Sequence, residues 1–202
     1  MRTLKEIFSA IDRYSNEARV ISDTIGKTLG NRYKYALSER KRLILYSIVK
    51  HLDPEVVIET GVGPGASTTM ILFALNRGRL YSIDVRKNLE GGEPVGFLVP
   101  DSLKHKWKLY IGKSRDVLPT LLGGEIRHVD LFLHDSEHTI ENILFELNIV
   151  WDYLREGGIV LIDNLNFTVA PYIFAREKRI EIYELDEEVG GLGIIIKGES
   201  RK

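Results

Sequence analysis

The sequence predicts an α/β fold in which a mostly parallel sheet has helices on both faces and ends in an antiparallel hairpin. From residue 56 onward, short apolar runs rich in β-branched residues alternate with segments of helical periodicity. This alternation is typical of a parallel sheet covered by helices. The last two runs, RIEIYEL and GLGIIIKG, are separated only by DEEVG. A parallel pair needs a crossover of about a dozen residues or more, so these two runs should form a hairpin.

The expected elements follow one another without an internal repeat or a low-complexity linker. Residues 3–50 are expected to be helical, because Leu4, Ile7 and Ile11 recur at helical spacing, and Pro54 closes this region. Strands are expected at residues 56–59, 79–85, 108–112, 129–134, 159–163, 179–185 and 191–198. Helices are expected at residues 67–76, 114–122, 139–155 and 168–178, with the glycine pair at 157–158 ending the third.

The length and composition of the chain limit the classes of protein to which it can belong. At 202 residues the chain has about the size of one domain, or of one domain with a small appendage. Its 28 basic and 29 acidic residues give a net charge of -1, so no overall charge attracts it to nucleic acid or anionic lipid. The absence of cysteine excludes disulfides and thiolate metal sites and fits a cytoplasmic protein. Charges interrupt the N-terminal segment every few residues, so we expect neither a signal peptide nor a membrane span there.

A glycine-rich turn, ETGVGPGAST at residues 59–68, lies between a predicted strand and a predicted helix. Gly61, Gly63 and Gly65 would permit tight turning and close approach of a ligand to the helix N-terminus, although such turns also occur for packing alone. Their G-x-G-x-G spacing differs from the G-x-G-x-x-G of dinucleotide sites. Asp84 ends the next strand, where a carboxylate can accept hydrogen bonds from both ribose hydroxyls of a nucleoside or cap a turn. Together these features predict a nucleoside site at the carboxyl edge of the sheet.

The stretch HDSEH at residues 134–138 admits two interpretations. His134, Glu137 and His138 match the H-x-x-E-H spacing of one class of zinc peptidases. That motif needs both histidines on one helix face, but His134 ends an apolar strand, so the context argues against a peptidase. The second interpretation is a carboxylate, Asp135, followed three residues later by a candidate base, His138.

Asp163 and Asn164 come at the end of the strand predicted at 159–163 and supply partners for Asp135. The carboxyl ends of adjacent parallel strands lie at one edge of a sheet, so the three side chains should meet there. Two carboxylates and an amide oxygen form a hard, all-oxygen site suited to Mg²⁺. The alternative is that Asp163 and Asn164 merely turn the chain and Asp135 caps the next helix. The glycine turn and Asp84 favour the functional interpretation.

From about residue 40 to its end, the chain resembles the class I S-adenosylmethionine-dependent methyltransferases. ETGVGPGAST resembles their first motif, YSIDV their ribose-binding acid, and IGKSRDVLP the segment that holds the adenine. The terminal hairpin is similar to the antiparallel pair that distinguishes them from NAD-binding Rossmann domains. Within the class, Asp135 and Asp163-Asn164 resemble the pattern of catechol O-methyltransferase-like enzymes, which have a lysine where this chain has His138. A histidine there resembles macrocin-type sugar O-methyltransferases and their cephalosporin hydroxylase relatives, which usually carry an acidic pair in place of Asp-Asn.

The resemblance implies a Rossmann-like, seven-stranded methyltransferase domain in residues 51–202, preceded by an N-terminal helical cap in residues 1–50. It implies S-adenosylmethionine and Mg²⁺ as cofactors and a small hydroxylated compound as methyl acceptor. His138 becomes the candidate base, with an ordinary surface histidine as the alternative. The cofactor-binding residues that it implies are Glu59, Gly61, Gly63, Gly65, Ser67, Asp84, Ser114, Arg115 and Asp135. The implied metal ligands are Asp135, Asp163 and Asn164.

Two alternatives to an O-methyltransferase stay open. A protein of this fold could bind the nucleoside cofactor without methyl transfer, and an NAD-linked oxidoreductase is disfavoured by the glycine spacing and the terminal hairpin. DNLN stands where amino-methylating enzymes have an NPPY-type tetrapeptide, so with a near-neutral charge we expect no nucleic-acid partner. We expect no membrane partner either, and the sequence leaves the formation of a homo-oligomer open.

Overall fold

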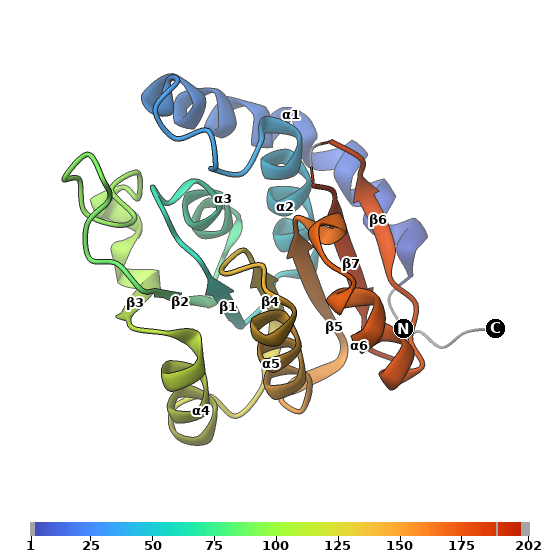
Figure 1. Cartoon of the computed structure of the whole chain (residues 1–202). Helices are drawn as coiled ribbons and strands as arrows, with labels where there is room; N and C mark the ends of the chain where they lie inside the picture. The colour runs from blue at the N-terminus through green and yellow to red at the C-terminus, as the bar shows by residue number, and fades with distance from the viewer. Residues whose placement is uncertain (1–2, 189, 199–202) are drawn as a thin grey trace.

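A computed structural model describes residues 3–188 and 190–198, and its strands form one sheet (Figure 1). The strands are β1 (Val56–Thr60), β2 (Arg79–Asp84), β3 (Trp107–Ile111), β4 (Val129–His134), β5 (Leu154–Asp163), β6 (Tyr183–Asp186) and β7 (Leu192–Ile196). Their order across the sheet is β3-β2-β1-β4-β5-β7-β6. Neighbouring strands pair in parallel except β7, which is antiparallel to both β5 and β6. This arrangement confirms the predicted seven-stranded, mostly parallel sheet with an antiparallel hairpin at its end.

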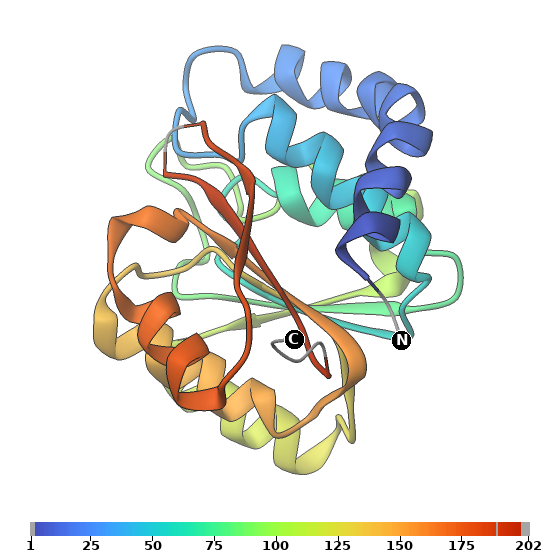
Figure 2. The same cartoon turned by 90° about the vertical axis from the view of Figure 1, so that its right-hand side faces the viewer.

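Helices cover both faces of the sheet, as predicted (Figures 1 and 2). One face is covered by α1 (Leu4–Leu29), α2 (Glu39–Leu52) and α3 (Ala66–Ala74). The other face is covered by α4 (Ser114–Gly124), α5 (Ile140–Trp151) and α6 (Ala170–Lys178). Two short 3-10 helices, η1 (Asp101–Lys106) and η2 (Leu165–Phe167), lie in the connections. No helix in the described part of the chain is both long and apolar enough to cross a membrane.

Alternate residues of the central strands divide the core into two layers. In β4, Leu131 and Leu133 pack in the layer of α1, α2 and α3, whereas Phe132 packs in the layer of α4, α5 and α6. All six residues of β4 are buried, because a parallel strand in the middle of such a sheet has an apolar layer on each side. Packing on both faces therefore fixes where the carboxyl ends of the central strands lie.

The N-terminal region expected to be helical, residues 3–50, contains two helices and a loop. Gly30 ends α1 with a positive φ of 55°, and Ser38 caps the N-terminus of α2 with its side chain. The intervening loop reaches the carboxyl edge of the sheet. α2 packs against both α1 and α3, and all three share one apolar core with the sheet. The division of the chain into a helical cap and a methyltransferase domain stays a prediction.

The helix expected at residues 139–155 is shorter than the sequence suggested. α5 ends at Trp151, and β5 already begins at Leu154. The glycine pair at 157–158 lies inside this strand and exchanges two backbone hydrogen bonds of 2.9 Å with Lys197. The prediction that these glycines end the helix was wrong, because pairing with the distant end of the chain draws the segment into the sheet.

Candidate active site

A cavity of about 740 Å³ opens at the carboxyl edge of the sheet. Its wall combines the glycine turn after β1, the segments that follow β2 and β3, and the loops that follow β4 and β5. The strand order reverses between β1 and β4 at this point, and open α/β sheets bind ligands where such a reversal occurs. Small-molecule sites typically enclose roughly 300–1,000 Å³. The cavity is therefore the candidate active site.

The glycine turn needs glycine for close backbone approach as well as for turning. Gly61, Gly63 and Gly65 have positive φ angles of 84°, 52° and 93°, which other residues rarely adopt. A Cβ on Gly61 would lie 1.9 Å from the carbonyl oxygen of Asp135, and one on Gly65 would lie 2.9 Å from the Cα of Gly96. The turn is thus held between the loop that follows β4 and the segment around Gly96 by contacts that a side chain would prevent.

Asp84 joins the end of β2 to the glycine turn. One carboxylate oxygen accepts hydrogen bonds from the N–H groups of Val62 and Gly63, both at 3.0 Å, and the other accepts from the Arg86 N–H at 2.9 Å. The residue is only 7% exposed, yet it lines the cavity. Asp84 therefore caps the turn after β2 and also offers a carboxylate to a ligand, so the two sequence interpretations of this residue are compatible.

Glu59 and Ser67 form a support beneath the glycine turn. The buried Glu59 carboxylate accepts hydrogen bonds from the hydroxyls of Ser67, Thr68 and Ser82 at 2.5, 2.8 and 2.7 Å. Burial raises the pKa of Glu59 to about 7, although the three hydroxyls oppose this shift. Ser67 lines the cavity, but Glu59 lies behind its wall. Glu59 thus ties the start of α3 to β1 and β2, and its expected contact with a cofactor stays a prediction.

Ser114 and Arg115 begin α4 and line another part of the wall. The Ser114 hydroxyl donates to Oδ1 of Asn142 at 3.3 Å, and the Arg115 guanidinium pairs with Glu141 at 2.8 Å. Both residues thus tie α4 to the first turn of α5 at the cavity. This is the segment that the resemblance assigned to the adenine.

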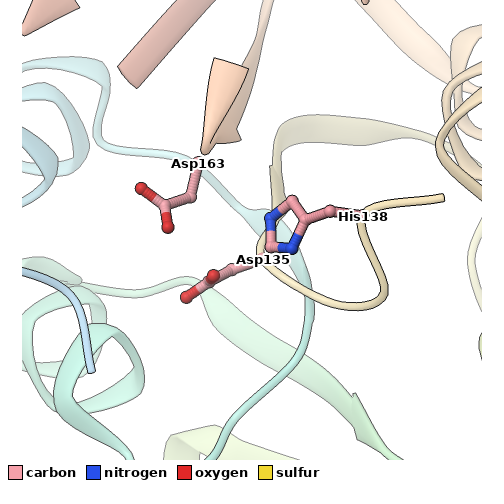
Figure 3. Close-up of side chains that lie close together, drawn as sticks. All are labelled: Asp135, His138 and Asp163. Carbon is pink, nitrogen blue, oxygen red and sulfur yellow. The ribbon is translucent and has the colours of Figure 1, made fainter. Parts of the chain in front are cut away.

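Asp135, His138 and Asp163 come together where β4 and β5 end (Figure 3). Each offers one ligand atom, and these atoms lie within 4.8 Å of one another. Burial raises the pKa of Asp135 well above its usual range, and the neighbouring Asp163 carboxylate raises it further. Two carboxylates this close repel each other unless a proton or a cation lies with them. The two carboxylates therefore fit a hard divalent cation such as Mg²⁺, and the imidazole lies beside them.

Asn164 adopts the left-handed conformation, with φ 53° and ψ 41°, which asparagine tolerates better than most residues. Its Nδ2 lies 3.3 Å from Nε2 of His138. Its Oδ1 lies so close to Gly190 that a Cβ there would come within 2.1 Å of it. The Asn164 amide, predicted as a metal ligand, thus contacts His138 through its nitrogen. Rotation of the amide group by half a turn would place Oδ1 beside His138 in place of Nδ2.

His138 is half-buried and lines the cavity, in contrast to an ordinary surface histidine. Burial lowers its pKa below the usual value, the neighbouring His134 lowers it further, and Asp163 opposes the shift. The ring packs against Phe167, with 5.8 Å between ring centroids. An imidazole that is neutral near pH 7 can accept a proton from a ligand.

His134 belongs to a buried network that was not predicted from the sequence. Its Nδ1 lies 2.7 Å from Oε2 of Glu146 on α5, and both side chains are fully buried. The Glu146 carboxylate also accepts from the Thr60 hydroxyl at 2.6 Å and the Ser136 hydroxyl at 2.8 Å. This network fixes the turn after β4, so the H-x-x-E-H spacing is incidental. A glutamate on the apolar face of α5, beside Leu147, is the signal that could have revealed it.

Lys41, in the first turn of α2, was not predicted as a site residue either. Its Nζ donates to Oδ1 of Asp163 at 2.7 Å, and the two side chains are 5% and 6% exposed. The partners lie 122 positions apart in the sequence. No pattern in ERKRLILYSIVKHL singles out this lysine, because periodicity alone does not show which residues of α2 face the ends of the strands.

A sequence profile of a methyltransferase domain family matches residues 58–165, more than half of the chain, and the chain belongs to this family. The family assignment supports a methyltransferase over the NAD-linked oxidoreductase. No curated protein sequence matches the chain.

Solved structures share the fold. An O-methyltransferase from Bacillus cereus in complex with S-adenosylhomocysteine (SAH) has a TM-score of 0.67 and 15% identity, over 93% of this chain and 100% of that one. TomG from Streptomyces achromogenes, an O-methyltransferase involved in tomaymycin synthesis and solved with S-adenosylmethionine, has a TM-score of 0.64 and 16% identity, over 98% and 100%. A methyltransferase from Geobacter sulfurreducens has a TM-score of 0.67 and 13% identity, over 96% of each chain. At such identities the likeness establishes the methyltransferase fold.

Proposed function

We propose that this methyltransferase transfers a methyl group from S-adenosylmethionine to a hydroxyl of a small acceptor, assisted by Mg²⁺ and by His138. The observation that supports the proposal is one cavity shared by the glycine turn, Asp84, Asp135 and His138. Gly61 lies against the Asp135 carbonyl, so the turn expected to bind the cofactor touches the loop that bears the carboxylate and the base. The structures from B. cereus and S. achromogenes, which hold SAH and S-adenosylmethionine, support the choice of cofactor.

The residues of the cavity would divide the work of methyl transfer. S-adenosylmethionine supplies, when bound, a methyl group on a sulfonium, and transfer to a hydroxyl releases one proton. Asp84 would accept hydrogen bonds from the ribose hydroxyls, and the glycines would allow the cofactor to approach the backbone. Such fixed alignment is the main requirement of an in-line displacement. His138, whose pKa is lowered by burial, would accept the proton near neutral pH.

Asp135 and Asp163, with Asn164 beside them, would hold Mg²⁺. Two observations support this role: their ligand atoms lie within 4.8 Å of each other, and the Asp163 carboxylate helps to raise the pKa of Asp135, as expected where two carboxylates share a site. When bound, Mg²⁺ would lower the pKa of the acceptor hydroxyl at this site. The carboxylates and the amide would thus orient the acceptor, while His138 takes its proton.

The proposal is tested by incubating the protein with S-adenosylmethionine and a panel of small hydroxylated compounds, including sugars and polyketide-like compounds, with Mg²⁺ or with EDTA. We expect SAH and a methylated product to form in equal amounts with at least one compound, and roughly tenfold more slowly in EDTA. Equal rates in both buffers would contradict the role of the ion. Saturable cofactor binding without methylation of any compound would favour a nucleoside-binding protein of the same fold.

A further inference from the structure

Lys41 is a buried cation at the candidate active site to which the proposed reaction assigns no part. Its Nζ donates to Oδ1 of Asp163 at 2.7 Å, with the lysine side chain only 5% exposed. The next residue, Arg42, is also buried but faces α1, where it donates to the Ser22 hydroxyl at 2.9 Å. Two adjacent cationic side chains at the start of α2 are thus buried, and they point in different directions. Arg42 points toward α1, whereas Lys41 points toward Asp163.

The ammonium of Lys41 acts on the same charges that would attract a divalent ion. Asp163 supplies a ligand atom within 4.8 Å of those of Asp135 and His138, and it is also the acceptor for Lys41. When ionised, Asp135 and Asp163 carry two negative charges. The Lys41 ammonium compensates one of these charges before any ion binds. Charges interact several times more strongly in a buried site than in water, so this compensation is large for any ion that binds beside it.

We propose that Lys41 is a resident counter-cation that weakens the divalent-cation site and thereby sets its affinity. The inference rests on the proposed function only in taking Asp135 and Asp163 as the ion's ligands. The sign follows from charge: the ammonium repels a nearby divalent ion and competes with it for Asp163, so removing that charge tightens binding. A lysine that merely held Asp163 in place would have the opposite effect, because its loss would weaken the ligand set.

The matched control lies one residue earlier on the same helix. Arg40 pairs with the buried Asp186 at 3.0 Å, and Asp186 does not belong to the cluster of Asp135, His138 and Asp163. Arg40→Met therefore removes a cation that is paired with a buried aspartate, as Lys41→Met does, but away from Asp135 and Asp163. Lys41→Arg serves as the second control, because it keeps the positive charge beside Asp163.

The test is a titration of each protein with MnCl₂, followed by calorimetry and by the electron paramagnetic resonance signal of free Mn²⁺. We expect Lys41→Met to bind Mn²⁺ at least roughly tenfold more tightly than the wild type. Lys41→Arg and Arg40→Met should bind within about twofold of the wild type, because Lys41→Arg keeps the local charge and Arg40 is exposed and therefore screened. If Lys41→Met does not fold, Lys41→Gln, which retains a hydrogen-bond donor, should show the same increase.

The outcomes separate this inference from the proposed function. Mn²⁺ binding in Lys41→Met or Lys41→Gln that is unchanged or weaker overturns the inference, and so does the absence of Mn²⁺ binding in the wild type and in both of these variants. SAH binding is measured in the same samples. If SAH binds while the charge at Lys41 has no effect on Mn²⁺, the inference fails and the proposed function stands. If SAH does not bind the wild type, the proposed function fails.

Discussion

The two sides of the candidate active site are built in different ways. The glycine-turn side consists of Gly61, Gly63, Gly65 and Asp84, which come from one β-α-β unit, and its hydrogen bonds join residues 21 and 22 positions apart. The carboxylate side consists of Asp135 and His138 from the loop after β4, Asp163 from the end of β5 and Lys41 from α2, and its ion pair joins residues 122 positions apart. The first side uses backbone N–H groups and one carboxylate, whereas the second buries several charges that must compensate one another.

Because of this difference, the two sides should be sensitive to different kinds of substitution. The glycine-turn side depends on backbone conformation, so a single methyl group can disrupt it. The carboxylate side depends on charge balance, so changes of protonation, counter-ion or base should affect it most. The two sides meet where Gly61 touches the Asp135 carbonyl.

The largest effect is expected for Gly61→Ala, because it breaks the contact between the two sides. The substitution adds a Cβ at a φ of 84° and within 1.9 Å of the Asp135 carbonyl oxygen. We expect loss of SAH binding and of Mn²⁺ binding, measured by calorimetry. Gly92→Ala is the matched control, since Gly92 has a φ of 89° but no atom within 4 Å of its Cβ position. That variant should lose only about 1–2 kcal/mol of stability, and equal effects in both variants would contradict the importance of the contact.

The next largest effect is expected for His138→Gln, which affects the carboxylate side alone. Loss of a general base lowers kcat by about 10²- to 10⁴-fold, whereas the affinity for SAH should stay within about twofold, because the glycine turn is unchanged. The measurement is kcat with the best acceptor found, together with an SAH titration. His105→Gln, at an exposed position in η1, should behave like the wild type. A His138→Gln variant that keeps most of its kcat would exclude this residue as the base.

Glu59→Gln changes the support of the glycine-turn side and should appear in the pH dependence of stability. The pKa of Glu59 rises from its ordinary value of 4.5 to about 7 on burial, so the folded state binds more protons between these values. The free energy of unfolding of the wild type should therefore fall by about 3 kcal/mol as the pH rises through this range. Urea unfolding at about pH 5 and about pH 8 should show that Glu59→Gln lacks this decrease.

The control for this pH effect is Glu177→Gln, at an exposed position on α6. Its unfolding should have the same pH dependence as that of the wild type. If Glu59→Gln and the wild type lose the same stability between the two pH values, Glu59 is not the group responsible.

The features of the fold that depend on local sequence patterns were predicted from the sequence. The order of strands and helices, the hairpin and the glycine turn follow from periodicity and turn residues over short stretches. Asp135, Asp163 and Asn164 were predicted to meet because they stand at the carboxyl ends of two strands. The structure places Asp135 and Asp163 together with His138, and Asn164 beside His138. The prediction that the glycine pair at 157–158 ends a helix was wrong, because this pair forms long-range backbone hydrogen bonds with Lys197.

Non-local partners could not be predicted in the same way. Lys41 reaches Asp163 only because α2 packs across the sheet, and Glu146 reaches His134 only because α5 packs under the turn after β4. Neither partner belongs to a motif, since each acts through a contact between distant elements. The partners of Glu59, which does lie within a motif, were not predicted either: its buried carboxylate accepts hydrogen bonds from three hydroxyls.

The most direct test of the central claim, that the glycine-turn side binds a nucleoside cofactor, is a calorimetric titration with SAH. The wild type is measured with Mg²⁺ and with EDTA, beside Asp84→Ala and a control, Asp101→Ala, whose side chain is 93% exposed. We expect micromolar binding in both buffers, unchanged in Asp101→Ala and at least roughly tenfold weaker in Asp84→Ala, which loses a charged hydrogen-bond acceptor. No binding of SAH by the wild type in either buffer would contradict the account.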